Sequence, residues 1–64
     1  MIERLTTAQA AAYLGKPEAT LRWWRHRDIG PRSYLIGRGV VYDRADLDQW
    51  LADQKAATMR GGNR

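Results

Sequence analysis

The stretch PEATLRWWRHR, residues 17–27, decides the fold that we expect for this 64-residue chain. Wound as an α-helix, it places Leu21 and Trp24 one turn apart on one side, which we expect to face the protein interior. The other side carries the positions i, i+3, i+4 and i+7 of the helix. These positions hold Ala19, Arg22, Trp23 and His26. This outer side is therefore cationic and aromatic, with one small residue.

The outer side of this helix has the chemistry that close approach to a DNA major groove requires. An arginine such as Arg22 grips guanine with two hydrogen bonds or clamps a phosphate, and a short side chain such as Ala19 lets a helix sit deep in the groove. We therefore interpret residues 17–27 as a helix that reads DNA sequence. The residues expected to contact DNA from this helix are Ala19, Thr20, Arg22, Trp23 and His26.

The positive charge of the chain is concentrated around this helix. The net charge is +4, and residues 16–44 hold seven basic and three acidic side chains, which accounts for all of it. Each phosphate that a protein neutralises releases counterions and adds affinity for any DNA sequence, so we favour a nucleic-acid surface over a merely solvated basic one. The residues expected to contact the DNA backbone, or the DNA beside a projecting wing, are Lys16, Arg25, Arg27, Arg32 and Arg38.

The composition excludes several other functions. With no cysteine and a single histidine, His26, the chain has neither a disulfide nor a metal site, and we expect no cofactor. The nucleophile, base and orienting group of hydrolytic chemistry cannot be assembled, so we do not expect an enzyme. There is no apolar run long enough to span a membrane and no secretory leader, which predicts a cytoplasmic protein, nucleoid-associated in a bacterial host.

The residues before the DNA-reading helix predict a first, shorter helix. Thr6 is expected to cap it, with Gln9 three residues later completing a capping box. Gly15 lies where a left-handed cap ends such a helix, and Pro17 stands at the entrance of the next. The turn of residues 15–17 is short enough to bring the second helix across the first. Residues 1–4 are expected to be a frayed lead-in.

After the second helix the periodicity changes from helix to strand. Residues 34–36 and 40–42 are β-favouring triplets on either side of Gly37-Arg38-Gly39, whose glycines permit the positive φ angles of a tight reversal. This pattern predicts a two-stranded hairpin with Arg38 at its tip. Because two strands alone are barely stable, we expect the hairpin to pack on the helices. The residues expected to make that contact are Leu35 or Ile36, together with Val41.

A third helix is predicted from Asp43, its expected N-cap, with Asp46 near the positive end of the helix dipole. The carboxylates Asp46, Asp48 and Asp53 are explained by capping and solubility rather than by acid–base or magnesium chemistry. Six large apolar side chains form the expected core. They are Leu14, Leu21, Trp24, Leu47, Trp50 and Leu51.

These elements together predict a mainly α fold of three helices with a two-stranded β-hairpin wing, a winged helix-turn-helix. We assign residues 1–54 to this domain and residues 55–64 to a flexible basic tail.

Five short motifs follow one another along the chain. They are Leu-Thr-Thr-x-x-Ala-Ala-x-Tyr-Leu-Gly at 5–15, Thr-Leu-Arg-x-Trp at 20–24, Gly-Pro-Arg at 30–32, Ile-Gly-Arg at 36–38 and Tyr-Asp-x-x-Asp-Leu-x-x-Trp-Leu at 42–51. In combination they resemble the small excisionase and AlpA-like proteins that have a MerR-type DNA-binding domain.

This resemblance implies a second helix in the major groove and a wing on the backbone or the minor groove beside it. It also implies that Arg22 contacts DNA, that Trp23 lies along the backbone and that Trp24 is buried. One position departs from the pattern: where relatives often have a serine cap before the second helix, this chain has Pro17.

Three functions are compatible with these observations. The first is an excisionase, a recombination directionality factor of a phage or integrative element, which binds repeated sites in double-stranded DNA, bends the DNA and directs an integrase towards excision. Such a protein is expected to cooperate with further copies of itself on DNA. The second is a small AlpA-like transcriptional regulator, which the sequence does not separate from the first. The third is a protein-docking module or a recognition module of phage DNA packaging.

Overall fold

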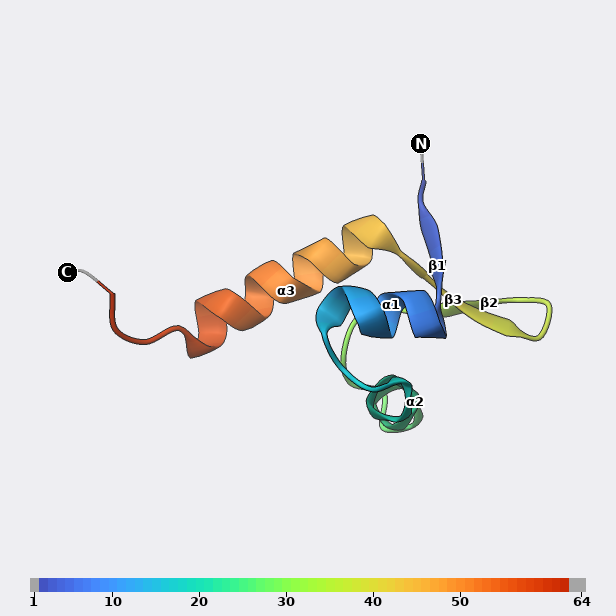
Figure 1. Cartoon of the computed structure of the whole chain (residues 1–64), viewed down its shortest axis with the longest axis horizontal. Coiled ribbons are helices and arrows are strands. Elements are labelled where there is room, and N and C mark those ends of the chain that lie inside the picture. The colour runs from blue at the N-terminus through green and yellow to red at the C-terminus, as the bar shows by residue number, and fades with distance from the viewer. Residues whose placement is uncertain (1, 63–64) are drawn as a thin grey trace.

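The computed structural model describes residues 2–62, which form three helices and a three-stranded antiparallel sheet (Figure 1). The elements in chain order are β1 (Arg4–Thr6), α1 (Thr7–Leu14), α2 (Glu18–His26), β2 (Tyr34–Ile36), β3 (Gly39–Asp43) and α3 (Arg44–Thr58). The hairpin of β2 and β3 and the helix α3 extend from the centre in opposite directions, so the described chain measures 48 × 28 × 18 Å. The three helices and the hairpin wing confirm the fold class expected from the sequence.

Both ends of α1 have the expected caps. The Thr6 hydroxyl accepts from the Gln9 amide at 3.1 Å, and the Gln9 side-chain oxygen accepts from the Thr6 amide at 2.9 Å, which completes the capping box. At the other end Gly15 has φ +72°, and the Lys16 amide donates to the Ala11 carbonyl at 2.9 Å. This left-handed turn starts the tight connection that leads into α2.

The sequence-based expectation of a frayed lead-in is wrong for Arg4, which begins β1. This strand pairs with β3, so that Arg4 lies opposite Asp43 and Leu5 opposite Tyr42, and β3 becomes the central strand of the sheet. The segment just before β1 is also held, because the Arg44 amide donates to the Glu3 carbonyl at 2.9 Å. A strand of three residues is too short to show a periodic pattern, which is why the sequence did not predict it.

The core lies where α1, α2, α3 and β3 meet. Its fully buried hydrophobic residues are Ala10, Ala11, Leu21, Tyr42 and Leu47. Partly buried residues that pack against them are Leu5, Leu14, Trp24 and Val40. The wing therefore packs on the helices through Tyr42 and Val40. The expectation that Leu35 or Ile36 would do so is wrong, because these side chains remain 55% and 53% exposed on the part of the hairpin that projects beyond the helices.

The end of α2 is anchored by Trp24. The Ile29 amide donates to the Trp24 carbonyl at 2.8 Å and the Asp28 amide to the Arg25 carbonyl at 3.1 Å, with Asp28 in the left-handed region at φ +59°. These are the two bonds of a Schellman motif, which turns the chain back over the helix. The Trp24 ring is also stacked at an angle on the Trp50 ring of α3, with 5.1 Å between ring centroids.

The helix α3 is longer than expected and only its first half packs on the body (Figure 1). The assignment of Leu51 to the core is wrong: it is 36% exposed, because it lies one turn beyond the fully buried Leu47 on a side of α3 that the rest of the protein covers only in part, whereas Trp50 still stacks on Trp24 of α2. Residues 55–58, assigned to the flexible tail, continue the helix; lysine and alanine are good helix formers. Residues 63–64 of that tail lie outside the described part of the chain.

Gly30 is expected to be the glycine least tolerant of substitution. It has φ +81°, and a Cβ atom there would lie 3.0 Å from both Cβ and Cε3 of Trp24, whereas a Cβ on Gly15, at φ +72°, would meet no atom within 4 Å. Both alanine variants suffer backbone strain of about 1–2 kcal/mol. We expect Gly30→Ala to lose about 1–3 kcal/mol more, the usual effect of overpacking. Chemical denaturation of both variants checks this, and equal losses would refute the contact.

Candidate nucleic-acid interface

The outward side of α2 exposes the side chains that the helical spacing places there. Ala19, Arg22, Trp23 and His26 are exposed, and Thr20 is half-buried with its amide bonded to the Pro17 carbonyl at 3.0 Å. Pro17 is the N-cap and makes no side-chain capping bond. A nine-residue helix is about 13.5 Å long, and its diameter of about 10–12 Å matches the width of a DNA major groove.

Arg22 is an accessible cation on this side of α2. Its side chain is 66% exposed and pairs with Glu18 one turn earlier, at 2.7 Å. An exposed ion pair at this spacing stabilises a helix by only about 0.3–0.5 kcal/mol. The Arg22 guanidinium can therefore readily leave Glu18 for another acceptor. Glu18 thus orients Arg22 along the helix surface while leaving it free to bind a base or a phosphate.

Trp23 and Arg27 form a stacked pair at the end of α2. The Arg27 guanidinium lies 5.1 Å from the centroid of the Trp23 ring, and Trp23 is 52% exposed. A cation–π contact of this kind restricts the guanidinium without neutralising it. The pair extends the cationic, aromatic surface of α2 to the last turn of the helix.

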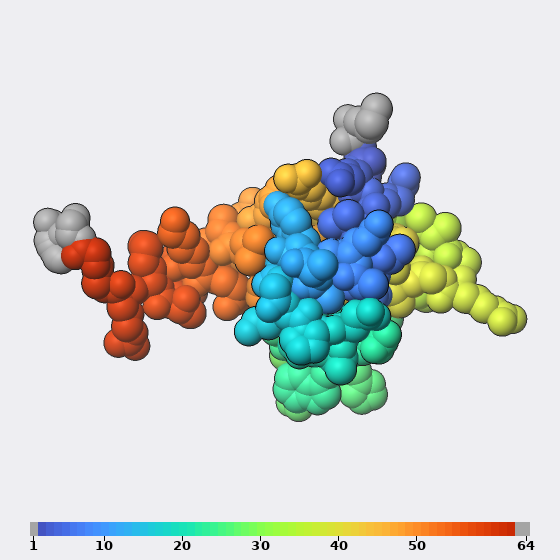
Figure 2. Space-filling model, viewed as in Figure 1, coloured from blue at the N-terminus to red at the C-terminus, as the bar shows by residue number. Residues whose placement is uncertain are grey.

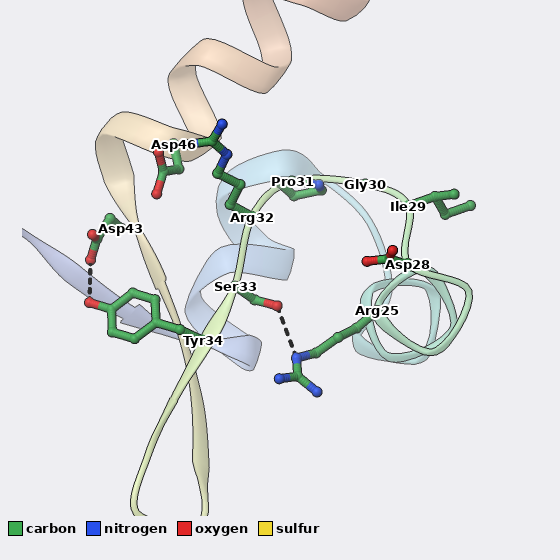
Figure 3. Close-up of a pocket in the computed structure, with 10 residues that line it drawn as sticks. All are labelled: Arg25, Asp28, Ile29, Gly30, Pro31, Arg32, Ser33, Tyr34, Asp43 and Asp46. Atoms are coloured by element: carbon green, nitrogen blue, oxygen red, sulfur yellow. Dashed lines mark hydrogen bonds between the residues drawn. The ribbon is translucent and has the colours of Figure 1, made fainter.

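Arg25 links α2 to the segment that leads into the wing. Its Nε donates to the Ser33 hydroxyl at 2.9 Å (Figure 3). The nearby Tyr42 phenol has a pKa raised mainly by burial, an effect that Arg25 and a hydrogen bond with Ser33 partly offset. Arg25 therefore positions the wing relative to α2, and its two remaining guanidinium nitrogens point away from the loop (Figure 3).

Arg32 lies apart from the other cations expected to touch DNA. Figure 3 shows its side chain extending towards Asp46 at the start of α3, on the side of the loop opposite to the Arg25 guanidinium. The groove between them has a volume of about 590 Å³ and is also lined by Asp28 and Asp43. With these carboxylates nearby, this groove is a poor place for a phosphate.

Arg38 occupies the tip of the wing. Ile36 pairs with Gly39, so the turn consists of Gly37 and Arg38 alone, with φ +61° at Gly37 and no positive φ at Gly39. Glycine at the first of two turn positions is typical of a type II′ hairpin. The side chain of Arg38 forms no hydrogen bond or ion pair with any described residue, and the tip projects as a narrow extension in Figure 2.

The base of the wing is held by one side chain from each strand. Arg4 Nε of β1 donates to the Tyr34 hydroxyl at 3.1 Å, and this hydroxyl donates to Asp43 Oδ1 at 2.7 Å. Asp43 is at the N-cap position of α3, as expected, but it makes no capping bond because its carboxylate accepts from Tyr34 instead. The hydrogen bond to Asp43 is the main cause that raises the pKa of Tyr34.

Sequence reasoning missed the residues that join α2 to the wing and the strands of the wing to one another. Ser33 and Tyr42 connect α2 to the sheet, and Arg4, Tyr34 and Asp43 fasten the three strands. A signal for one of these bonds was present, since Tyr34 begins the predicted hairpin and Asp43, the predicted N-cap of the third helix, directly follows its second strand, which brings the two residues near each other. No pattern in the sequence pointed to Arg4.

Other kinds of site are missing from residues 2–62. No group of three acidic, histidine or cysteine side chains there is arranged to hold a metal ion. Over the same residues, none of the helices has the length and apolar character needed to cross a bilayer.

Two helices joined by a tight turn, the second exposing a cationic and aromatic side beside a projecting hairpin, define the class of winged helix-turn-helix DNA-binding domains. The chain belongs to the helix-turn-helix domain family, whose model matches residues 4–55. DNA is the partner that this family implies. No curated protein and no solved structure matches the chain significantly.

The neighbouring tryptophans of α2 are expected to have opposite roles. Trp24→Ala should lose about 3–5 kcal/mol of stability, because the ring packs on Trp50 and against the Gly30 backbone. Trp23→Ala should change stability by no more than about 0.5 kcal/mol, since the ring is half exposed, and should weaken DNA binding instead. Thermal unfolding and a DNA-binding titration of both variants check this. Equal loss of folding in the two would contradict the assignment.

Tyr34 is expected to make the wing sensitive to alkaline pH. Because its folded-state pKa is raised above about 10, the folded protein holds the phenol proton more tightly than the unfolded chain. This stabilisation is complete below pH 10 and is lost as the pH rises above it. The advantage of the wild type over Tyr34→Phe in thermal unfolding should therefore stay constant up to about pH 10 and shrink as the pH rises above it. A difference that does not change with pH would refute the role of this proton.

Proposed function

We propose that this protein is an architectural, sequence-specific DNA-binding protein that acts as an excisionase. In this role it binds repeated sites in double-stranded DNA, bends the DNA and directs an integrase towards excision. It has no catalytic chemistry of its own. Under this proposal the protein is located in the cytoplasm of a bacterial host, associated with the nucleoid. Copies bound to neighbouring DNA sites cooperate with one another.

The observation that carries the proposal is that α2 exposes a cationic and aromatic side beside a projecting wing whose tip has an unpaired arginine. The side of α2 that carries Arg22 and Trp23 is exposed, and the Arg38 side chain at the wing tip is unpaired among the described residues. One element fits the major groove and the other reaches the phosphates or the minor groove alongside. A protein that holds both grooves at once can stabilise a bent duplex, at a deformation cost of about 1–6 kcal/mol that its contacts must offset.

The residues proposed to contact DNA fall into two groups. Ala19, Thr20, Arg22, Trp23 and His26 face the major groove from α2. Lys16, Arg25, Arg27, Arg32 and Arg38 are proposed for the backbone and the wing. Arg32 is the weakest member of the second group, because it extends towards Asp46.

Two other functions would give different results in the footprinting and bending experiment described below. A small AlpA-like regulator would use the same surface at a single promoter site. A docking or DNA-packaging module would use a protein-facing surface, and the acidic residues of α3 are the expected candidates. Two of these carboxylates already accept hydrogen bonds within the protein, Asp48 from the Tyr13 hydroxyl and Asp53 from the side-chain amide of Gln49. This supports the two DNA-binding functions over the docking module.

The test is footprinting and a circular-permutation bending assay on the DNA that flanks this protein's own gene, at two salt concentrations. Several protected repeats with a bend would support an excisionase. One unbent promoter site would favour a regulator, and the absence of protection would contradict DNA binding as the function.

Arg22 provides the matched control for this experiment. We expect Arg22→Ala to weaken specific binding by about 1–3 kcal/mol while the thermal unfolding curve stays unchanged, because this side chain is exposed. Arg22→Lys keeps the charge but loses the two-pronged grip, so it should retain salt-dependent, non-specific binding and lose discrimination between sequences. Wild-type affinity in Arg22→Ala would show that another face of the protein contacts DNA.

A further inference from the structure

The wing carries two large apolar side chains that the described protein leaves more than half exposed. Leu35 and Ile36 are 55% and 53% exposed, although they are consecutive residues of one strand. Successive side chains in a strand point to opposite faces, so the hairpin is apolar on both faces near its tip. Two aliphatic side chains exposed next to each other near the end of a projecting hairpin are candidates for contact with a partner.

Of the two, Ile36 is the one that lies at the tip. It is followed directly by the turn residues Gly37 and Arg38, and its cross-strand partner is Gly39, which has no side chain to cover it. Leu35 lies one residue further from the tip and opposite Val40, which packs against the core. Ile36 is therefore the apolar side chain that the wing presents to whatever its tip meets.

The shape and charge of the tip fit the minor groove of DNA. Glycines flank Arg38 on both sides, and side chains added at Gly37 would meet no atom within 4 Å, so the tip is thin and unobstructed. Only the two-residue turn and the side chains beside it need to enter the minor groove, which is about 6 Å wide. Arg38 supplies an unpaired positive charge, and arginine is the residue that narrow minor grooves attract most strongly. A positively charged tip is better suited to DNA than to a cationic neighbouring copy.

The wing is also held firmly enough to transmit force. The bonds from Arg4 to Tyr34 and from Tyr34 to Asp43 join all three strands at its base, and Tyr42 fixes β3 in the core with only 2% exposure. A side chain can separate stacked bases only if its support does not yield. The third strand, β1, makes the base of this wing stiffer than an isolated hairpin.

We propose that Ile36 is a wedge that inserts between base pairs from the minor groove and kinks the DNA, with Arg38 beside it in the groove. Apolar residues that partly unstack a base step in this way bend DNA by roughly 20–90°. The inference rests on the proposed DNA binding and adds to it a residue that causes the bend. In this arrangement α2 recognises the DNA sequence, and Ile36 bends the DNA at the recognised site.

The test uses the full chain and a duplex selected by the wild-type protein from a random pool, labelled at both ends for energy transfer. The fluorescent base 2-aminopurine is placed at the steps beneath the wing. Ile36→Ser should remain folded and bound, but it should lose most of the bend and of the 2-aminopurine signal that reports unstacking. Leu35→Ser, an equally exposed residue on the same strand, is the matched control and should retain both.

The outcomes separate the wedge from the function on which it rests. If the wild type selects no duplex, DNA binding itself fails. If the wild type bends its site and Ile36→Ser bends it equally, or if only Leu35→Ser loses the bend, then Ile36 is not the wedge while DNA binding stands. If Ile36→Ser abolishes cooperation between adjacent sites but leaves the bend at a single site unchanged, the apolar tip contacts a second copy instead, and the wedge is refuted.

Discussion

The position of α2 depends on the contact between the Trp24 indole and the backbone that turns over it. The ring lies against Gly30, where no Cβ could be accommodated without a shift, and it also stacks on Trp50 of α3. Because the ring is held between these elements, α2 cannot roll about its own axis. The outward direction of Arg22 and Trp23 is therefore a geometric consequence of how their neighbour is packed.

Acidic and basic side chains have separate tasks in this molecule. Most of the bonded carboxylates hold one element to another: Glu3 pairs with Arg44, Asp43 accepts from Tyr34, and Asp48 accepts from Tyr13. The cations on α2 and at the wing tip are exposed, and those that have partners are only lightly held. This division lets a small chain with both signs of charge expose a largely cationic surface without a large net charge.

Helical elements were predicted more accurately from the sequence than the sheet. The capping box at Thr6, the left-handed Gly15 and the side of α2 that faces inward follow from contacts between residues close in sequence, which spacing alone describes. The missed features join distant residues: β1 pairs with β3, and Tyr42 supplies the buried contact assigned to Leu35 or Ile36. The exposure of Leu51 was missed for another reason, since helical spacing shows which side of α3 a residue is on and not how much of that side the rest of the protein covers.

The long-range pairing of β1 also affects the order in which the chain can fold. The helices α1 and α2 are neighbours in sequence and can associate as soon as both are made. Arg4 must wait for Asp43, its partner 39 residues later, before the sheet has its third strand. Closing so large a loop is slow compared with local helix formation. The residues of β1, although they are synthesised before both helices, are thus among the last to reach their final place, and the base of the wing forms only when synthesis has passed the hairpin.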